Sequence, residues 1–123
     1  HRMKLKNLLP SLREKKRYVL FRVISEEKIE VHQLKEAFFS NMLNMFGETG
    51  VAQIKARFLD KLWDPERQIG ILRVNHKEKF KVIVALGLIL RIGESRVNVK
   101  IYKISGTLKS LMEKFKDRKE LKN

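Results

Sequence analysis

The fold of this chain is decided by residues 17–25, which read RYVLFRVIS. The stretch is rich in β-branched and aromatic residues, and its side chains point alternately to two sides, as they do along a β-strand. One side is a purely apolar row made of Val19, Phe21 and Val23. We therefore predict a strand whose apolar row faces the protein core.

Downstream of this strand, the sequence predicts a helix and then a hairpin. Apolar residues recur at helical spacing over residues 27–46, and Gly47 predicts the end of that helix. Side chains alternate again over residues 53–63 and 68–75, which are separated by the turn sequence DPER. These two stretches predict a pair of adjacent antiparallel strands.

The last third of the chain supplies a second helix, a fourth strand and a terminal helix. Residues 76–92 predict the helix, residues 96–105 predict the strand, and Thr107 predicts the N-terminal cap of the last helix. The order is β-α-β-β-α-β plus a C-terminal helix. We therefore expect an α/β (α+β) fold of the ferredoxin-like kind, an antiparallel sheet with two helices on one face.

Length and composition exclude several classes of protein. The chain has 123 residues, of which 43% are hydrophobic, and this suffices for one domain, which we place at residues 4–123. We expect Met3 to be the natural start and the two residues before it to be a cloning remnant. The lack of cysteine excludes disulfides, a Cys-ligated zinc site and a thiol nucleophile. No apolar stretch approaches the roughly 18 residues that span a bilayer, so we expect a cytoplasmic protein away from membranes.

The charge of the chain is strongly positive and unevenly distributed. Lys and Arg number 28 against 14 Asp and Glu, which gives a net charge of +14. Residues 23–67 carry a net charge of −2, whereas residues 1–22, 68–102 and 103–123 carry +7, +5 and +4. Such an excess is matched most often by nucleic acid and less often by an anionic membrane surface, and composition alone does not choose between these two partners. The 34% of charged residues is also typical of hyperthermophiles, but that explains the number of charges and not their imbalance.

The two sides of the predicted sheet differ in character. Alternation assigns to the core side a second set of apolar residues, namely Leu72, Val74, Val97, Val99 and Ile101. The opposite side then mixes cations with apolar residues, namely Tyr18, Leu20, Arg22, Lys55, Arg57, Ile69, Ile71, Arg73, Asn98, Lys100 and Tyr102.

Two interpretations of this mixed side stay open. In the first, RNA lies on it and is held by phosphate contacts, because the third strand lacks the aromatic residues that stack on bases. In the second, the terminal helix covers the apolar residues and leaves the charges at the rim. The apolar stripe for such a cover is Leu108, Leu111, Met112 and Phe115.

The second predicted helix is apolar over most of its circumference, which is unusual for a surface helix of a small domain. Either the neighbouring helix covers its second side, or that side binds another protein. We favour a protein interface, and expect self-association or a companion protein. Its candidate residues come from both helices, namely Phe39, Leu43, Phe46, Phe80, Ile83 and Leu90.

Residues for a self-contained active site are not evident. His32 and His76 lie on different predicted helices without a carboxylate at relay spacing, and the sequence has no phosphate-binding glycine loop, paired-carboxylate metal motif or serine-nucleophile signature. The pair Glu26 and Glu27 is more typical of a helix N-terminus than of a catalytic site. We expect no catalytic residue and no metal held by the protein.

Three blocks of sequence resemble a known family. They are LPSLREKKRYVLFRVIS at residues 9–25, GILRVNHKEKFKVIVALGLILRIG at residues 70–93 and VKIYKISGTLKSL at residues 99–111. Their order and spacing resemble archaeal ribonuclease P protein component 2, the family related to the eukaryotic Pop five and Rpp fourteen subunits. The similarity runs from about residue 4 to residue 111.

The resemblance implies a fold and a function. Members of this family have an RRM-like α/β fold and bind RNA within ribonuclease P, an endonuclease that removes the 5′ leader from precursor tRNA. The RNA and its Mg²⁺ ions perform that cleavage. The resemblance further implies a barrel-like protein partner, component 3, and self-association of component 2 within a heterotetramer.

We interpret the basic residues on this basis. Those expected to neutralise phosphates of ribonuclease P RNA are Arg13, Lys15, Lys16, Arg17, Arg22, Arg73, His76, Lys77 and Lys100. One alternative is a general RNA-binding or ribosome-associated module without a part in tRNA processing. Another is a scaffold whose charge serves only solubility.

Overall fold

A single antiparallel sheet organises the protein. The computed structural model describes residues 15–116, and the structural statements below concern this part of the chain. The five strands are β1 (Lys16–Ser25), β2 (Arg57–Phe58), β3 (Ile69–Asn75), β4 (Arg91–Ile92) and β5 (Ser95–Ser105), in the spatial order β2-β3-β1-β5-β4. Without the short edge strand β4, this is the strand order of the ferredoxin-like plan, so the predicted fold class is confirmed.

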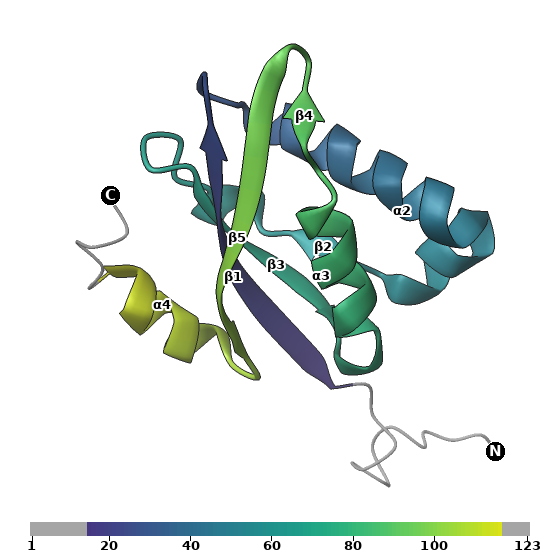
Figure 1. Cartoon of the computed structure of the whole chain (residues 1–123). Coiled ribbons are helices and arrows are strands. Elements are labelled where there is room, and N and C mark those ends of the chain that lie inside the picture. Colours follow the sequence, from purple (N-terminus) through teal and green to yellow (C-terminus); the bar gives the residue numbers. More distant parts are fainter. Residues whose placement is uncertain (1–14, 117–123) are drawn as a thin grey trace, which may run out of the picture.

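Helices cover both faces of this sheet. The helices α2 (Val31–Ile54) and α3 (Lys79–Gly87) lie on one side, and α4 (Leu108–Lys116) lies on the other (Figure 1). Two short 3-10 helices, η2 (Asp60–Leu62) and η3 (His76–Glu78), follow β2 and β3. The cap predicted for the last helix is present, because the Ser110 amide donates to Thr107 Oγ1 over 3.3 Å.

The main core lies between the sheet and the helices α2 and α3. Val19, Phe21 and Val23 of β1 are buried there, as their alternation predicted. From α2, Leu34, Phe38 and Met42 pack into the same cluster. The predicted core residues of β3 and β5 also belong to it, with Leu72, Val74, Val97 and Val99 buried and Ile101 partly buried.

The opposite face of the sheet is covered by α4. Leu111 has no exposed surface, and it packs against Leu20, Ile69 and Ile71, which are also buried. Half-buried residues around this second cluster are Tyr18, Leu59, Leu62, Tyr102, Leu108 and Met112. Of the two interpretations of the mixed face, the structure therefore supports the cover, and RNA cannot reach the middle of the sheet while α4 is in place.

Two predictions were wrong, namely the end of the first helix at Gly47 and the strand over residues 53–63. Gly47 adopts the left-handed region with φ 73° and kinks the helix, but the backbone becomes helical again and α2 continues to Ile54. The strand predicted over residues 53–63 is only the two-residue β2, because Lys55 ends α2 in a left-handed conformation and η2 follows. The alternating residues there belong to the end of a helix and to a short edge strand.

The predicted helix over residues 76–92 is much shorter in the structure. It begins as the 3-10 helix η3, continues as α3 and ends at Gly87. Arg91 and Ile92 instead form β4, which pairs with Ser95 and Arg96 across a turn containing Gly93 at φ 60°. The apolar residues of this segment still reach the core, with Val82, Ala85, Leu86, Ile89 and Ile92 all buried.

Gly70 of β3 occupies a position that excludes any side chain. A Cβ atom there would lie 2.8 Å from Cζ of Phe21 and 2.9 Å from Cε3 of Trp63. We predict that Gly70→Ala lowers the free energy of unfolding by roughly 1 to 3 kcal/mol, because overpacking forces the rings apart. Urea denaturation followed by Trp63 fluorescence measures it. Gly87→Ala is the matched control, since its Cβ would meet nothing within 4 Å, and an equal loss there would contradict the explanation.

Candidate nucleic-acid interface

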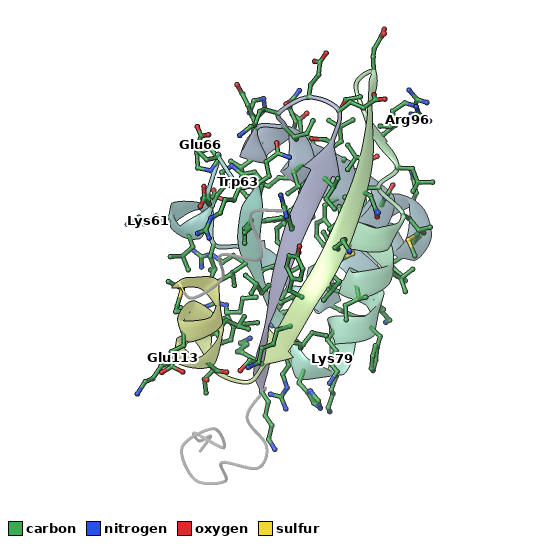
Figure 2. All side chains as sticks on the ribbon, turned by 60° about the vertical axis from the view of Figure 1, so that its left-hand side comes forward. Lys61, Trp63, Glu66, Lys79, Arg96 and Glu113 are labelled. Carbon is green, nitrogen blue, oxygen red and sulfur yellow. The ribbon has the colours of Figure 1, made fainter. Side chains whose placement is uncertain are left out.

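The two ends of the sheet carry different charged side chains. Beyond Ser25, at one end of β1, acidic and basic side chains pair: Arg96 Nε with Glu26 Oε2 at 3.3 Å, and Lys28 Nζ with Glu66 Oε1 at 3.4 Å. Figure 2 shows Glu66 and Arg96 at this end and Lys79 near the other. Basic side chains gather at the other end, and we name this group the basic end: Lys15, Lys16, Arg17, His76, Lys77 and Lys79.

Strand pairing brings the basic end together from distant parts of the sequence. Lys16 is opposite Asn75, the last residue of β3, and the chain turns directly into η3. The His76 amide donates to the Lys15 carbonyl over 2.6 Å, which holds the start of η3 against the start of β1. Asn75 Oδ1 accepts from the Lys77 amide over 3.1 Å and fixes the turn between strand and helix. The basic side chains therefore project from a well-defined backbone.

His76 lies at the centre of this group. Burial, together with the positive charges of Arg17, Lys79 and Lys15, lowers the pKa of His76 below its usual value of 6.5. Its Nδ1 atom is shielded from solvent and makes no hydrogen bond to the part of the chain that the structure describes. At neutral pH the imidazole is consequently uncharged, and a phosphate bound beside it would favour its protonation.

Arg17 connects the basic end to the loop before α4. Its Nη1 donates to the Lys16 carbonyl over 2.9 Å. A Cβ atom on Gly106 would come within 3.4 Å of the same Nη1, so the guanidinium lies close to the backbone of this loop. The basic end is thus formed by two places in the chain, the start of β1 and the η3–α3 segment, and the β5–α4 loop lies beside it.

The other residues predicted to contact RNA lie elsewhere. Arg22 and Lys100 are opposite each other across β1 and β5, six residues or about 20 Å along β1 from Lys16. Arg73 is opposite Tyr18 on β1 and opposite Arg57 on the edge strand β2. Arg13 lies outside the described residues. The predicted set is therefore distributed over more than one surface.

Lys79 was missed by the sequence interpretation, although its charge contributes to the environment of His76. A signal was available, since Lys79 follows His76 by three residues at the start of a helix, and residues three apart share a face. Glu78, between them, forms an ion pair with Lys81 over 3.0 Å. Because Glu78 is paired with Lys81, its carboxylate is less available to the cations of the basic end.

A second exposed feature is apolar and lies on the helices. Phe80 and Leu90 are 68% and 65% exposed, and Leu43 is 48% exposed. The other predicted interface residues are less accessible: Ile83 is half-buried, and Phe39 and Phe46 pack partly against the core. The sequence interpretation missed three exposed apolar residues, namely Met45, Val84 and Leu88.

The described residues offer neither a metal site nor a membrane span. Within residues 15–116, no three or more His, Cys, Asp or Glu side chains are grouped so that they could hold a metal ion. None of the helices in the same range is long and apolar enough to cross a bilayer.

The chain is similar in sequence to archaeal proteins that share one name. A protein named ribonuclease P protein component 2 from Pyrococcus furiosus is 37% identical over 110 residues, which cover 89% of this chain and 90% of that protein. The protein of the same name from Archaeoglobus fulgidus is 39% identical over 111 residues, covering 90% and 97%.

A solved structure has the same fold at low sequence identity. A chain in the cryo-EM structure of yeast ribonuclease MRP aligns with a TM-score of 0.61 and 16% identity, over 84% of this chain and 92% of that one. Residues 17–116 match the model of the Rpp14/Pop5 family. This chain belongs to the Rpp14/Pop5 family.

Proposed function

We propose that this chain is an RNA-binding subunit of ribonuclease P, which removes the 5′ leader from precursor tRNA in the cytoplasm. The observation that carries the proposal is the basic end, a group of basic side chains on two segments that strand pairing brings together, in a chain whose archaeal relatives are named ribonuclease P protein component 2. Cations held by a fixed backbone suit contact with phosphates and carry no preference for base sequence.

In this proposal the protein supplies positive charge that stabilises the folded RNA, and the RNA performs the cleavage. Lys15, Lys77 and Lys79 neutralise phosphates that approach one another when the RNA folds. This lowers the concentration of Mg²⁺ that the RNA needs, and the Mg²⁺ ions are held by the RNA and not by the protein. No catalytic residue of the chain takes part.

Reconstitution tests the proposal directly. We expect the full chain, added with component 3 to its cognate ribonuclease P RNA, to lower the Mg²⁺ concentration at which precursor tRNA is cleaved at half the maximal rate. RNA binding that falls with salt but leaves cleavage unchanged would instead support a general RNA-binding module. Absence of salt-dependent RNA binding would support the other alternative, a scaffold whose charge serves only solubility.

We also propose that the exposed apolar residues of α2 and α3 bind protein partners, component 3 and a second copy of the chain. Phe80 and Val84 are one helical turn apart on α3, and Leu88 follows one turn later at the end of the helix. A single stripe of this kind is typical of an interface, because large apolar side chains carry most of the binding energy. Lys81 lies over the Phe46 ring at 5.6 Å and borders the stripe with charge.

The double change Phe80→Ser and Val84→Ser is expected to weaken binding of component 3 by about 30-fold, the equivalent of about 2 kcal/mol for losing an interface anchor. Isothermal titration calorimetry measures the affinity. Because both side chains are exposed, the free energy of unfolding should change by less than about 0.5 kcal/mol. Ile24→Ser removes a similarly exposed apolar residue, 43% accessible, at the ion-paired end of β1. Equal weakening by that control would contradict this location of the interface.

A further inference from the structure

The edge of the sheet holds a pair of arginines that ordinary folding energetics disfavour. Arg57 of β2 and Arg73 of β3 are directly opposite each other in an antiparallel pair. Side chains in such positions have Cβ atoms about 5 Å apart, and like charges placed there destabilise the sheet. A like-charge pair at this position suggests a role other than stability.

Neither arginine is neutralised by the described part of the protein. Arg57 is exposed and Arg73 half-buried, and neither side chain makes an ion pair or hydrogen bond to a described residue. The nearest carboxylate on this edge, Asp60, is already bound by Lys35, with 2.8 Å between Oδ2 and Nζ. Among the residues that the structure describes, repulsion between the two guanidinium groups is therefore uncompensated.

These groups line one open depression at the edge of the sheet. Its walls include Lys35, Arg57, Asp60, Lys61, Leu62 and Arg73. Lys61 is exposed on η2, and Figure 2 shows it at the outer edge of the molecule, near Trp63. The depression thus presents three cations without an acidic partner among the described residues, Arg57, Lys61 and Arg73, beside one carboxylate that is already paired.

We propose that this depression binds one phosphate of an RNA backbone, held jointly by Arg57 and Arg73 with Lys61 beside them. Guanidinium groups match the geometry of phosphate oxygens with paired hydrogen bonds, and a shared anion turns the repulsion between two arginines into attraction for both. The inference rests on the proposed function and adds a second RNA contact, at the edge of the sheet and apart from the basic end. RNA that touches both sites passes around the side of the domain, because α4 covers the middle of the sheet.

The test compares Arg57→Gln, Arg73→Gln and the double variant in the full chain. Two measurements are expected to move in opposite directions. In low salt without RNA, the double variant should melt at the same temperature as the wild type or a few degrees higher, about 1 to 3 °C, because repulsion is removed. Its affinity for cognate ribonuclease P RNA should fall about tenfold. Lower thermal stability together with weaker binding would assign the pair a structural role and overturn the site.

The salt dependence of RNA binding distinguishes one shared phosphate from two separate ones. If both arginines hold the same phosphate, the double variant loses about one unit from the slope of log K against log salt. A loss of about two units would mean two independent contacts and would overturn the shared site. Inorganic phosphate is a second probe, and it should raise the melting temperature of the wild type by more than that of the double variant.

Arg91→Gln is the matched control. Arg91 is an exposed arginine on β4, at the opposite edge of the same sheet, and its replacement removes one positive charge, as each single variant does. If the double variant binds RNA as well as the Arg91 variant does, the depression is not an RNA site, while the basic end remains a valid proposal. If the wild type itself shows no salt-dependent RNA binding, the proposed function fails instead.

Discussion

Replacing Leu111 with alanine is expected to lower the free energy of unfolding by roughly 2 to 5 kcal/mol, the usual loss when a fully buried leucine is truncated. Leu111 is completely buried, and its partners Leu20, Ile69 and Ile71 come from β1 and β3. The loss should therefore be that of a core residue, although α4 is a short helix near the end of the chain. Urea denaturation monitored by Trp63 fluorescence measures it, since Trp63 is the one tryptophan of the chain.

Glu113→Ala on the same helix is the control. Glu113 is exposed, and Figure 2 shows it on the outer side of α4. Alanine has the higher helix propensity, so this change should alter the free energy of unfolding by less than about 0.5 kcal/mol. If Leu111→Ala behaved like Glu113→Ala, α4 would not be docked on the sheet in solution, and the middle of the sheet would be open to RNA.

The docking of α4 explains where the cations of this protein can act. The middle of the sheet is apolar and covered, so it is closed to a polyanion. Cations remain accessible at the start of β1, at η3 and along the β2 edge. An RNA chain can contact these places only by following the rim of the domain, where contacts go to phosphates and bases are not stacked on the sheet.

The alternation of residues 17–25 was sufficient to predict the central strand, because a strand with one buried face must alternate in this way. The same rule failed for residues 53–63. There, Ile54 is buried at the end of α2 and Phe58 on β2, while Lys55 between them has a left-handed backbone with φ 56°. Two buried residues four apart are compatible with either a helix or a strand, and only tertiary contacts decide between them.

The basic end shows a different limit of sequence interpretation. Lys15 and His76 are far apart in the sequence, and their contact depends on the register of β1 against β3, in which Lys16 is opposite Asn75. The sequence predicted that both segments are basic, but it could not predict that one hydrogen bond joins them. For the same reason the arginine pair of the β2 edge could not be foreseen, because the predicted strand had no fixed register.

Neutralising three lysines of the basic end should weaken RNA binding strongly. The triple change Lys15→Gln, Lys77→Gln and Lys79→Gln removes three cations from separate positions around His76. Each phosphate contact contributes about 0.7 to 0.9 to the slope of log K against log salt, so the slope should fall by two to three units in magnitude. When salt is raised from about 50 to about 200 mM, the triple variant should then lose about 15- to 60-fold less affinity for RNA than the wild type loses. Filter binding of cognate ribonuclease P RNA across this range measures it.

A control with the same change of net charge separates local contact from general attraction. Lys28→Gln, Arg91→Gln and Arg96→Gln together also remove three cations, but from the opposite end of the sheet, where Lys28 and Arg96 already pair with glutamates. If the two triple variants reduced the slope equally, net charge alone would explain RNA binding. If only the Lys15, Lys77 and Lys79 variant does so, phosphates lie at the basic end. In that variant the pKa of His76 should also rise toward its usual value, because two of the charges that lower it are gone. Measured by NMR without RNA, that rise shows independently that the substituted lysines surround the histidine.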